Sequence, residues 1–201
     1  MSNAPNIQDE AVKFLERDFS ESYGQLRHYD TQITDLMKFS VTLYIATLTA
    51  ALGVYQFSLE KGIQLDLAVK ALLISGLLAG LFMLWLLVRS RVYFVRVARY
   101  INEHRHFFTR LKPLGFPNDS AMYTDAKYPK YFSWGSSHSV FAYVASALNA
   151  SLLGTLLFVH FSGNCYQRVY VVVSFLLALV LQIVVVSFHL KGMEKHTEGV
   201  A

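Results

Sequence analysis

Four long stretches of the chain lack charged residues almost entirely, and no other feature constrains its fold as strongly. They cover residues 39–57, 67–88, 139–161 and 169–190, and Lys70 is the only Lys, Arg, Asp or Glu within them. Because a helix rises about 1.5 Å per residue, about 20 apolar residues cross the roughly 30 Å hydrocarbon core of a bilayer. The stretches therefore predict an all-α integral membrane protein with four transmembrane helices.

The composition agrees with this class. Hydrophobic residues make up 54% of the 201 positions and charged residues 16%, whereas a typical soluble domain has about 45–50% apolar and about 25% charged residues. Short connections over residues 58–66 and 162–168 join the stretches into two antiparallel hairpins. We expect five segments: an amphipathic arm (1–38), a first transmembrane hairpin (39–88), a basic arm with an interfacial loop (89–138), a second transmembrane hairpin (139–190) and a tail (191–201).

The distribution of Lys and Arg predicts the orientation. Residues 1–38 contain four, residues 89–138 contain nine and the tail contains two, while each hairpin connection contains one. Because Lys and Arg are enriched in cytoplasmic loops, we expect both termini and the central arm in the cytoplasm. In a bacterium the host membrane would be the cytoplasmic (inner) membrane.

Both arms show the spacing of amphipathic helices. In the first arm apolar and aromatic residues recur at alternating intervals of three and four, which is typical of a coiled-coil seam. The first arm has seven acids against four bases, and residues 89–138 have nine bases against three acids, so we expect the arms to pack together within one subunit. A second, compatible interpretation is that the seam also assembles a homo-oligomer. This heptad seam consists of Leu15, Phe19, Leu26, Tyr29, Ile33 and Leu36.

The central arm contains the clearest basic cluster of the sequence. Such a cluster beside a membrane span most often binds anionic lipid headgroups, each cation contributing about 1 kcal/mol. The alternative is a charged ligand such as a nucleotide or oligonucleotide, whereas no motif for duplex nucleic acid is present. The prolines and aromatic residues that follow, over residues 113–138, favour an irregular segment at the membrane interface, and the alternative is a binding loop. The candidate ligand or lipid residues are Arg89, Arg91, Arg96, Arg99, Arg105 and Arg110.

Small and weakly polar residues form stripes within the apolar stretches, and residues 76–80 match the GxxxG pattern of closely packed helices. One interpretation is packing inside a single bundle, and the other is the lining of a pore. The amides of Asn149 and Gln182 lie deep in the expected hydrocarbon layer, where each should find a partner across a helix interface. The candidate pore-lining residues are Thr42, Thr49, Gly53, Gln56, Ser146 and Asn149, and Ala46 belongs to the same face as the first four.

Several classes of function lack their expected residues. Motifs of common enzymes are absent, so we expect no catalytic residues and no cofactor. His104 and His106 are two positions apart and point to different faces of a helix, and Cys165 is the only cysteine, so we expect no metal site. The spans contain no carboxylate of the kind that proton-coupled transporters and pumps use, which disfavours secondary active transport.

The order of segments resembles that of small bacterial SLATT-type membrane effectors. A heptad-bearing helix leads into a close transmembrane pair and then into a basic helical extension between Arg89 and Arg110. The resemblance is one of architecture over residues 10–112, and the second hairpin departs from a two-span domain. It implies a pore-forming effector that acts downstream of nucleotide-producing enzymes in antiviral defence.

Two hypotheses about function follow from the sequence. The first is a homo-oligomeric effector or ion-channel-like protein that forms or gates a pore in response to a cytoplasmic signal. In that case its partners are membrane lipids, further copies of the chain and a nucleotide or oligonucleotide signal. The second is a non-conducting membrane scaffold or adaptor that recruits a partner through its cytoplasmic helices.

Overall fold

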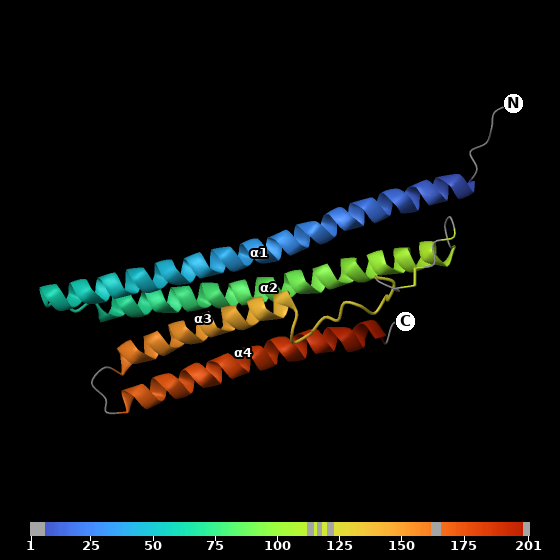
Figure 1. The fold of residues 1–201 in the computed structure, drawn as a ribbon. Coiled ribbons are helices and arrows are strands. Elements are labelled where there is room, and N and C mark those ends of the chain that lie inside the picture. Colours follow the sequence, from blue (N-terminus) through green and yellow to red (C-terminus); the bar gives the residue numbers. More distant parts are fainter. Residues whose placement is uncertain (1–6, 112–114, 116–117, 120–122, 162–165, 199–201) are drawn as a thin grey trace. The chain divides into compact units, whose positions relative to one another are not determined.

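In the part of the chain that the structure describes, the regular elements are four long helices. The computed structural model describes residues 7–111, 115, 118–119, 123–161 and 166–198, so Cys165 lies outside the described residues. Each helix contains a segment long and apolar enough to cross a membrane, which confirms the all-α class and the four apolar helices. The helices are α1 (Ile7–Lys61), α2 (Asp66–Arg110), α3 (Ser137–His160) and α4 (Gln167–Glu198) (Figure 1).

The first two helices are much longer than a membrane span. Helix α1 has 55 residues and α2 has 45, so each predicted arm continues an apolar stretch without a break. Acidic residues in the first turns, such as Asp66, and basic residues in the last turns, such as Arg110, oppose the partial charges of the helix ends. Gly62, with φ of 65°, follows the end of α1 and adopts a conformation that glycine accepts at low cost.

The chain packs as two compact units. We call the first the arm unit, which comprises residues 1–32 and 90–131. The second comprises residues 33–89 and 132–201, and we call it the membrane unit because it contains the four apolar stretches. Helices α1 and α2 contribute to both. These units follow packing, whereas the five segments expected from the sequence follow the anticipated membrane boundaries, and that division stays a prediction.

The membrane unit has a core built from several helices. Its centre consists of Tyr44 and Ala51 of α1, Val69 and Leu73 of α2 and Leu152 of α3. Helices α3 and α4 lie side by side (Figure 1). The centre thus contains one large aromatic side chain, Tyr44, among smaller aliphatic ones, while most bulky aliphatic side chains of α4 remain exposed.

Candidate functional site

A chain of hydrogen bonds crosses the core of the membrane unit. The Tyr44 hydroxyl of α1 donates to Asn149 Oδ1 of α3 over 2.5 Å. Asn149 Nδ2 donates to Gln182 Oε1 of α4 over 2.9 Å, and Gln182 Nε2 donates to the Ala178 carbonyl oxygen. Asn149 is completely buried. The expectation that Asn149 and Gln182 each find a partner across a helix interface is therefore confirmed, whereas the part of Tyr44 was missed.

Helix α2 approaches this polar cluster closely at Gly80, which has no side chain. A methyl group added at Gly80 would overlap Asn149 Oδ1 and the Tyr44 hydroxyl, and one added at Gly76 would overlap the Thr47 side chain. Both glycines are buried. The GxxxG pattern is thus used for close packing inside one chain, which confirms the packing interpretation for this motif.

The candidate pore-lining residues do not form one surface in the single chain. Ser146 and Asn149 are buried in the core, and the Ser146 hydroxyl donates to the Ala142 carbonyl oxygen of its own helix. The other four are exposed on α1 and share a face with Ala46. We call this face the outer stripe of α1, and it consists of Thr42, Ala46, Thr49, Gly53 and Gln56.

The outer stripe differs from the other outward surfaces of the membrane unit. A methyl group added at Gly53 would meet no atom of the described residues within 4 Å, so none of them covers this position. On the other helices the exposed side chains are mostly large and apolar, although Ala71 and Ser75 of α2 are exposed as well. The exposed Ile45 and Leu52 flank the stripe on α1. The large apolar side chains include Ile74, Leu78 and Phe82 on α2 and Val173, Leu177 and Leu181 on α4.

The six candidate arginines are divided by the fold of the arm unit. Arg91 and Arg99 are buried, with exposed fractions of 6% and 7%. Arg89, Arg96 and Arg110 are exposed, and Arg105 is half-buried. The expected basic cluster is therefore not a single surface.

The buried arginines hold the segment of residues 125–131, which we call the strap. Arg91 donates through Nη2 to the Lys130 carbonyl oxygen over 2.7 Å and through Nε to that of Tyr131 over 3.2 Å. Arg99 Nε donates to the Pro129 carbonyl oxygen over 3.0 Å, and its guanidinium lies 4.6 Å from the centre of the Tyr131 ring. Burial lowers the pKa of Arg91 to about 10, which still leaves it charged at neutral pH.

Asn102, which lies one turn after Arg99 on α2, also binds the strap. Its Nδ2 donates to the carbonyl oxygens of Asp125 over 3.0 Å and Tyr128 over 2.7 Å. Charged and amide donors on one face of α2 thus donate hydrogen bonds to the backbone carbonyls of this irregular segment. Sequence reasoning missed Asn102, although its position three residues after Arg99 places it on the same helix face.

The two arms pack against each other in the arm unit, as their spacing and charge predict. The rings of Tyr29 and Tyr93 stack with centres 5.7 Å apart, and those of Phe19 and His104 with centres 6.2 Å apart. Within the heptad seam Leu15 and Leu26 are also half-buried, whereas Ile33 and Leu36 belong to the membrane unit, where Ile33 is buried and Leu36 half-buried. The seam is thus covered by the same chain in the arm unit, and its use between copies stays a prediction.

A polar contact accompanies this stacking. The Tyr100 hydroxyl donates to Asp18 Oδ2 over 2.6 Å, and this hydrogen bond raises the pKa of Tyr100. His104 Nε2 lies 3.6 Å from the same oxygen. Within the described part of the chain, His104 Nδ1 is buried and has no hydrogen-bond partner.

The arm unit also has grooves on its surface. One, of about 390 Å³, lies between Phe19 and Phe108 and includes the polar side chains of Glu16, Arg105 and Thr109. The Arg105 guanidinium lies 5.1 Å from the centre of the Tyr123 ring. Among the described residues no group of three or more His, Cys, Asp or Glu side chains is placed to bind a metal ion.

Comparisons of the chain with protein families, with curated proteins and with solved structures find no match.

Proposed function

We propose that this protein is a membrane effector that works as a homo-oligomer and forms or gates a pore in response to a cytoplasmic signal. The observation that carries the proposal is the outer stripe of α1. Its polar and small residues are exposed together on one face, whereas most of the exposed residues of α2 and α4 are large and apolar.

The proposal includes a transmembrane arrangement of the four helices. Helices α1 and α2 form one membrane hairpin and α3 and α4 form the other, with both termini and the arms in the cytoplasm. The apolar segments of all four helices support insertion. The excess of Lys and Arg in the arms and tail supports the orientation.

The outer stripe suits a position beside water or beside another copy better than one in lipid. Hydroxyl and amide groups gain nothing from hydrocarbon, and small residues permit close approach of helices. If copies surround an axis with α1 innermost, Thr49 and Gln56 face the lumen while Leu78 and Leu177 face lipid. The bonds of Asn149 then serve to hold the two hairpins of each copy together.

The arm unit is the proposed receiver of the signal. Arg96 and Arg110 are exposed, and Arg105 lines a groove between two phenylalanine rings. Cationic and aromatic groups of this kind suit a phosphorylated ligand with a planar ring, such as a nucleotide. The resemblance to SLATT-type effectors supports the same class of signal and a role in antiviral defence.

A leak assay tests the proposal directly. The protein is reconstituted in vesicles loaded with a fluorescent dye, and nucleotides and short oligonucleotides are added as candidate signals. Thr49→Leu and Gln56→Leu should each change dye release, because both narrow and dehydrate the proposed lumen. Ser75→Leu is the matched control, since Ser75 is exposed on α2 and its hydroxyl bonds the Ala71 carbonyl oxygen of its own helix. Absence of dye release with every added compound, or a stable monomer in detergent, would refute the pore.

One observation favours a second candidate function, a non-conducting scaffold. The arm unit exposes large apolar side chains, among them Phe14, Phe107 and Leu111. Such residues on a cytoplasmic surface fit the docking of a partner protein. In this case removal of residues 1–38, or the milder change Phe14→Ser, should abolish co-purification of the partner, and retained binding would count against the scaffold.

A further inference from the structure

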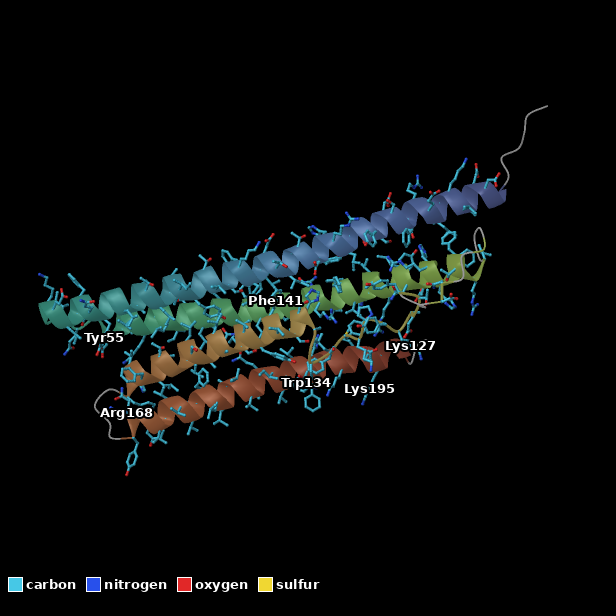
Figure 2. All side chains as sticks on the ribbon, in the orientation of Figure 1. Tyr55, Lys127, Trp134, Phe141, Arg168 and Lys195 are labelled. Atoms are coloured by element: carbon cyan, nitrogen blue, oxygen red, sulfur yellow. The ribbon has the colours of Figure 1, made fainter. Side chains whose placement is uncertain are left out.

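An aromatic and cationic cluster lies where the apolar surface of the membrane unit ends. The Lys191 ammonium lies 5.5 Å from the centre of the Phe132 ring. Phe132 and Trp134 meet edge to face with centres 4.9 Å apart, and Trp134 and Tyr143 have centres 6.1 Å apart. Lys195 follows Lys191 by one helical turn, and Figure 2 labels it near the end of α4. We call these five residues the interfacial cluster.

The interfacial cluster has one aromatic ring that is buried and one that is largely exposed. Phe132 is buried, whereas 64% of Trp134 is exposed. The segment that carries Trp134 is held by a hydrogen bond from the Tyr143 hydroxyl to the Trp134 carbonyl oxygen and by another from Ser136 N to the Ser133 carbonyl oxygen. The indole is therefore presented outward on a fixed backbone.

The position of the cluster along the helices matches the headgroup level of a membrane. Lys191 directly follows the apolar stretch of residues 169–190, and Trp134 lies three residues before the start of α3 at Ser137. Indole rings favour the boundary between hydrocarbon and water, and lysine stems extend along apolar surface toward that boundary. The ammonium groups thus lie where lipid phosphates would be.

The charges of the cluster identify the ligand class. Lys191 and Lys195 are both exposed, while Glu194 between them is half-buried. Two exposed cations on successive turns complement a negatively charged headgroup. A zwitterionic headgroup also offers a phosphate, but its own cation opposes the attraction.

We propose that the interfacial cluster binds the headgroup of an anionic phospholipid. The phosphate lies between the Lys191 and Lys195 ammonium groups, and the glycerol region lies against Trp134. This inference rests on the part of the proposed function that places the membrane unit in a bilayer, and it does not require a pore. Each cation favours an anionic surface by about five-fold, so two predict a preference of roughly thirty-fold over a zwitterionic lipid.

Trp134 itself provides the probe. The chain has two tryptophans, so Trp85→Phe leaves Trp134 as the only one. The full-length variant is reconstituted with phosphatidylglycerol or phosphatidylcholine brominated near the headgroup, and quenching of indole fluorescence measures the occupancy of each lipid beside Trp134. We expect preferential quenching by the anionic lipid, and we expect Lys191→Gln with Lys195→Gln to bring the two lipids close to equal occupancy.

A control at the other end of α4 distinguishes a local site from net charge. Arg168 is exposed there (Figure 2), and Arg168→Gln should leave the lipid preference unchanged. Equal quenching by both lipids, or a preference that survives the double lysine substitution, overturns the inference. Quenching by neither lipid overturns the bilayer position and with it the proposed function, whereas lipid preference without dye release refutes the pore alone.

Discussion

Replacing Asn149 with leucine tests whether the buried polar chain stabilises the membrane unit. The change removes the hydrogen bond from Tyr44 and the one to Gln182. Hydrogen bonds between transmembrane helices contribute about 0.6 kcal/mol on average and up to about 1.7 kcal/mol each. Leaving the Tyr44 hydroxyl and Gln182 Oε1 unpaired in a buried site costs about 1–3 kcal/mol more. Because leucine has the same branched arrangement of heavy atoms and a larger volume, no cavity is left, and we expect a total loss of about 2–4 kcal/mol.

Reversible unfolding in mixed micelles, followed by circular dichroism as denaturing detergent increases, measures this loss. Thr155→Ala is the control, because the Thr155 hydroxyl bonds the Ser151 carbonyl oxygen of its own helix. Thr155→Ala should lower the free energy of unfolding by about 0.5 kcal/mol or less, because it removes no hydrogen bond between helices. A double-mutant cycle with Tyr44→Phe isolates the bond between Tyr44 and Asn149. If Asn149→Leu costs no more than Thr155→Ala, or the cycle shows no coupling, the reasoning is wrong.

Three further substitutions address packing, the strap and the arms. Gly80→Ala should destabilise the membrane unit by about 1–3 kcal/mol in the same unfolding assay, because the added methyl overlaps the Tyr44 hydroxyl. Arg99→Gln should speed tryptic cleavage within the strap by about ten-fold, since losing one charge-assisted bond is worth about 1.5 kcal/mol. Tyr100 should ionise above the ordinary tyrosine pKa of about 10, because its hydroxyl donates to Asp18. That bond stabilises the arm contact fully below pH of about 10 and is lost as pH rises through the higher folded-state pKa, so Tyr100→Phe should remove one late-ionising group from the tyrosinate absorbance titration.

Each of these three substitutions has a control. Gly53→Ala should not destabilise the protein, because space around Gly53 is open and alanine favours a helix more than glycine does, and an equal loss of stability from the two glycine changes would contradict the packing argument. Arg96→Gln should leave cleavage of the strap unchanged, since Arg96 is exposed, and faster cleavage there would show that charge alone protects the strap. Coincident titration curves for wild type and Tyr100→Phe would contradict the bond to Asp18.

The arginines show why part of the site escaped prediction. The sequence does not distinguish the arginines of this helix from one another, so their number beside an apolar stretch indicated one exposed basic cluster. They include Arg91, Arg96, Arg99 and Arg105. Which of them turn inward depends on where the strap crosses α2, and the strap is separated from Arg91 by about 40 residues of chain. Asn149 was easier to interpret, because a hydrocarbon layer offers an amide no partner other than another helix.

The local sequence pattern was sufficient to predict the all-α class of this protein. Uncharged stretches of about 20 residues predict four membrane-length helices, and the spacing of apolar residues predicts that both arms are helical, because hydropathy and helical period are read within a few turns. The tertiary structure alone decided which face of each helix is covered. The close approach at Gly80 places Tyr44 and Asn149 in the core and leaves Thr49 and Gln56 outside. When a helix has polar residues on two faces, its own sequence does not determine which face is buried. The helices that pack against it determine this.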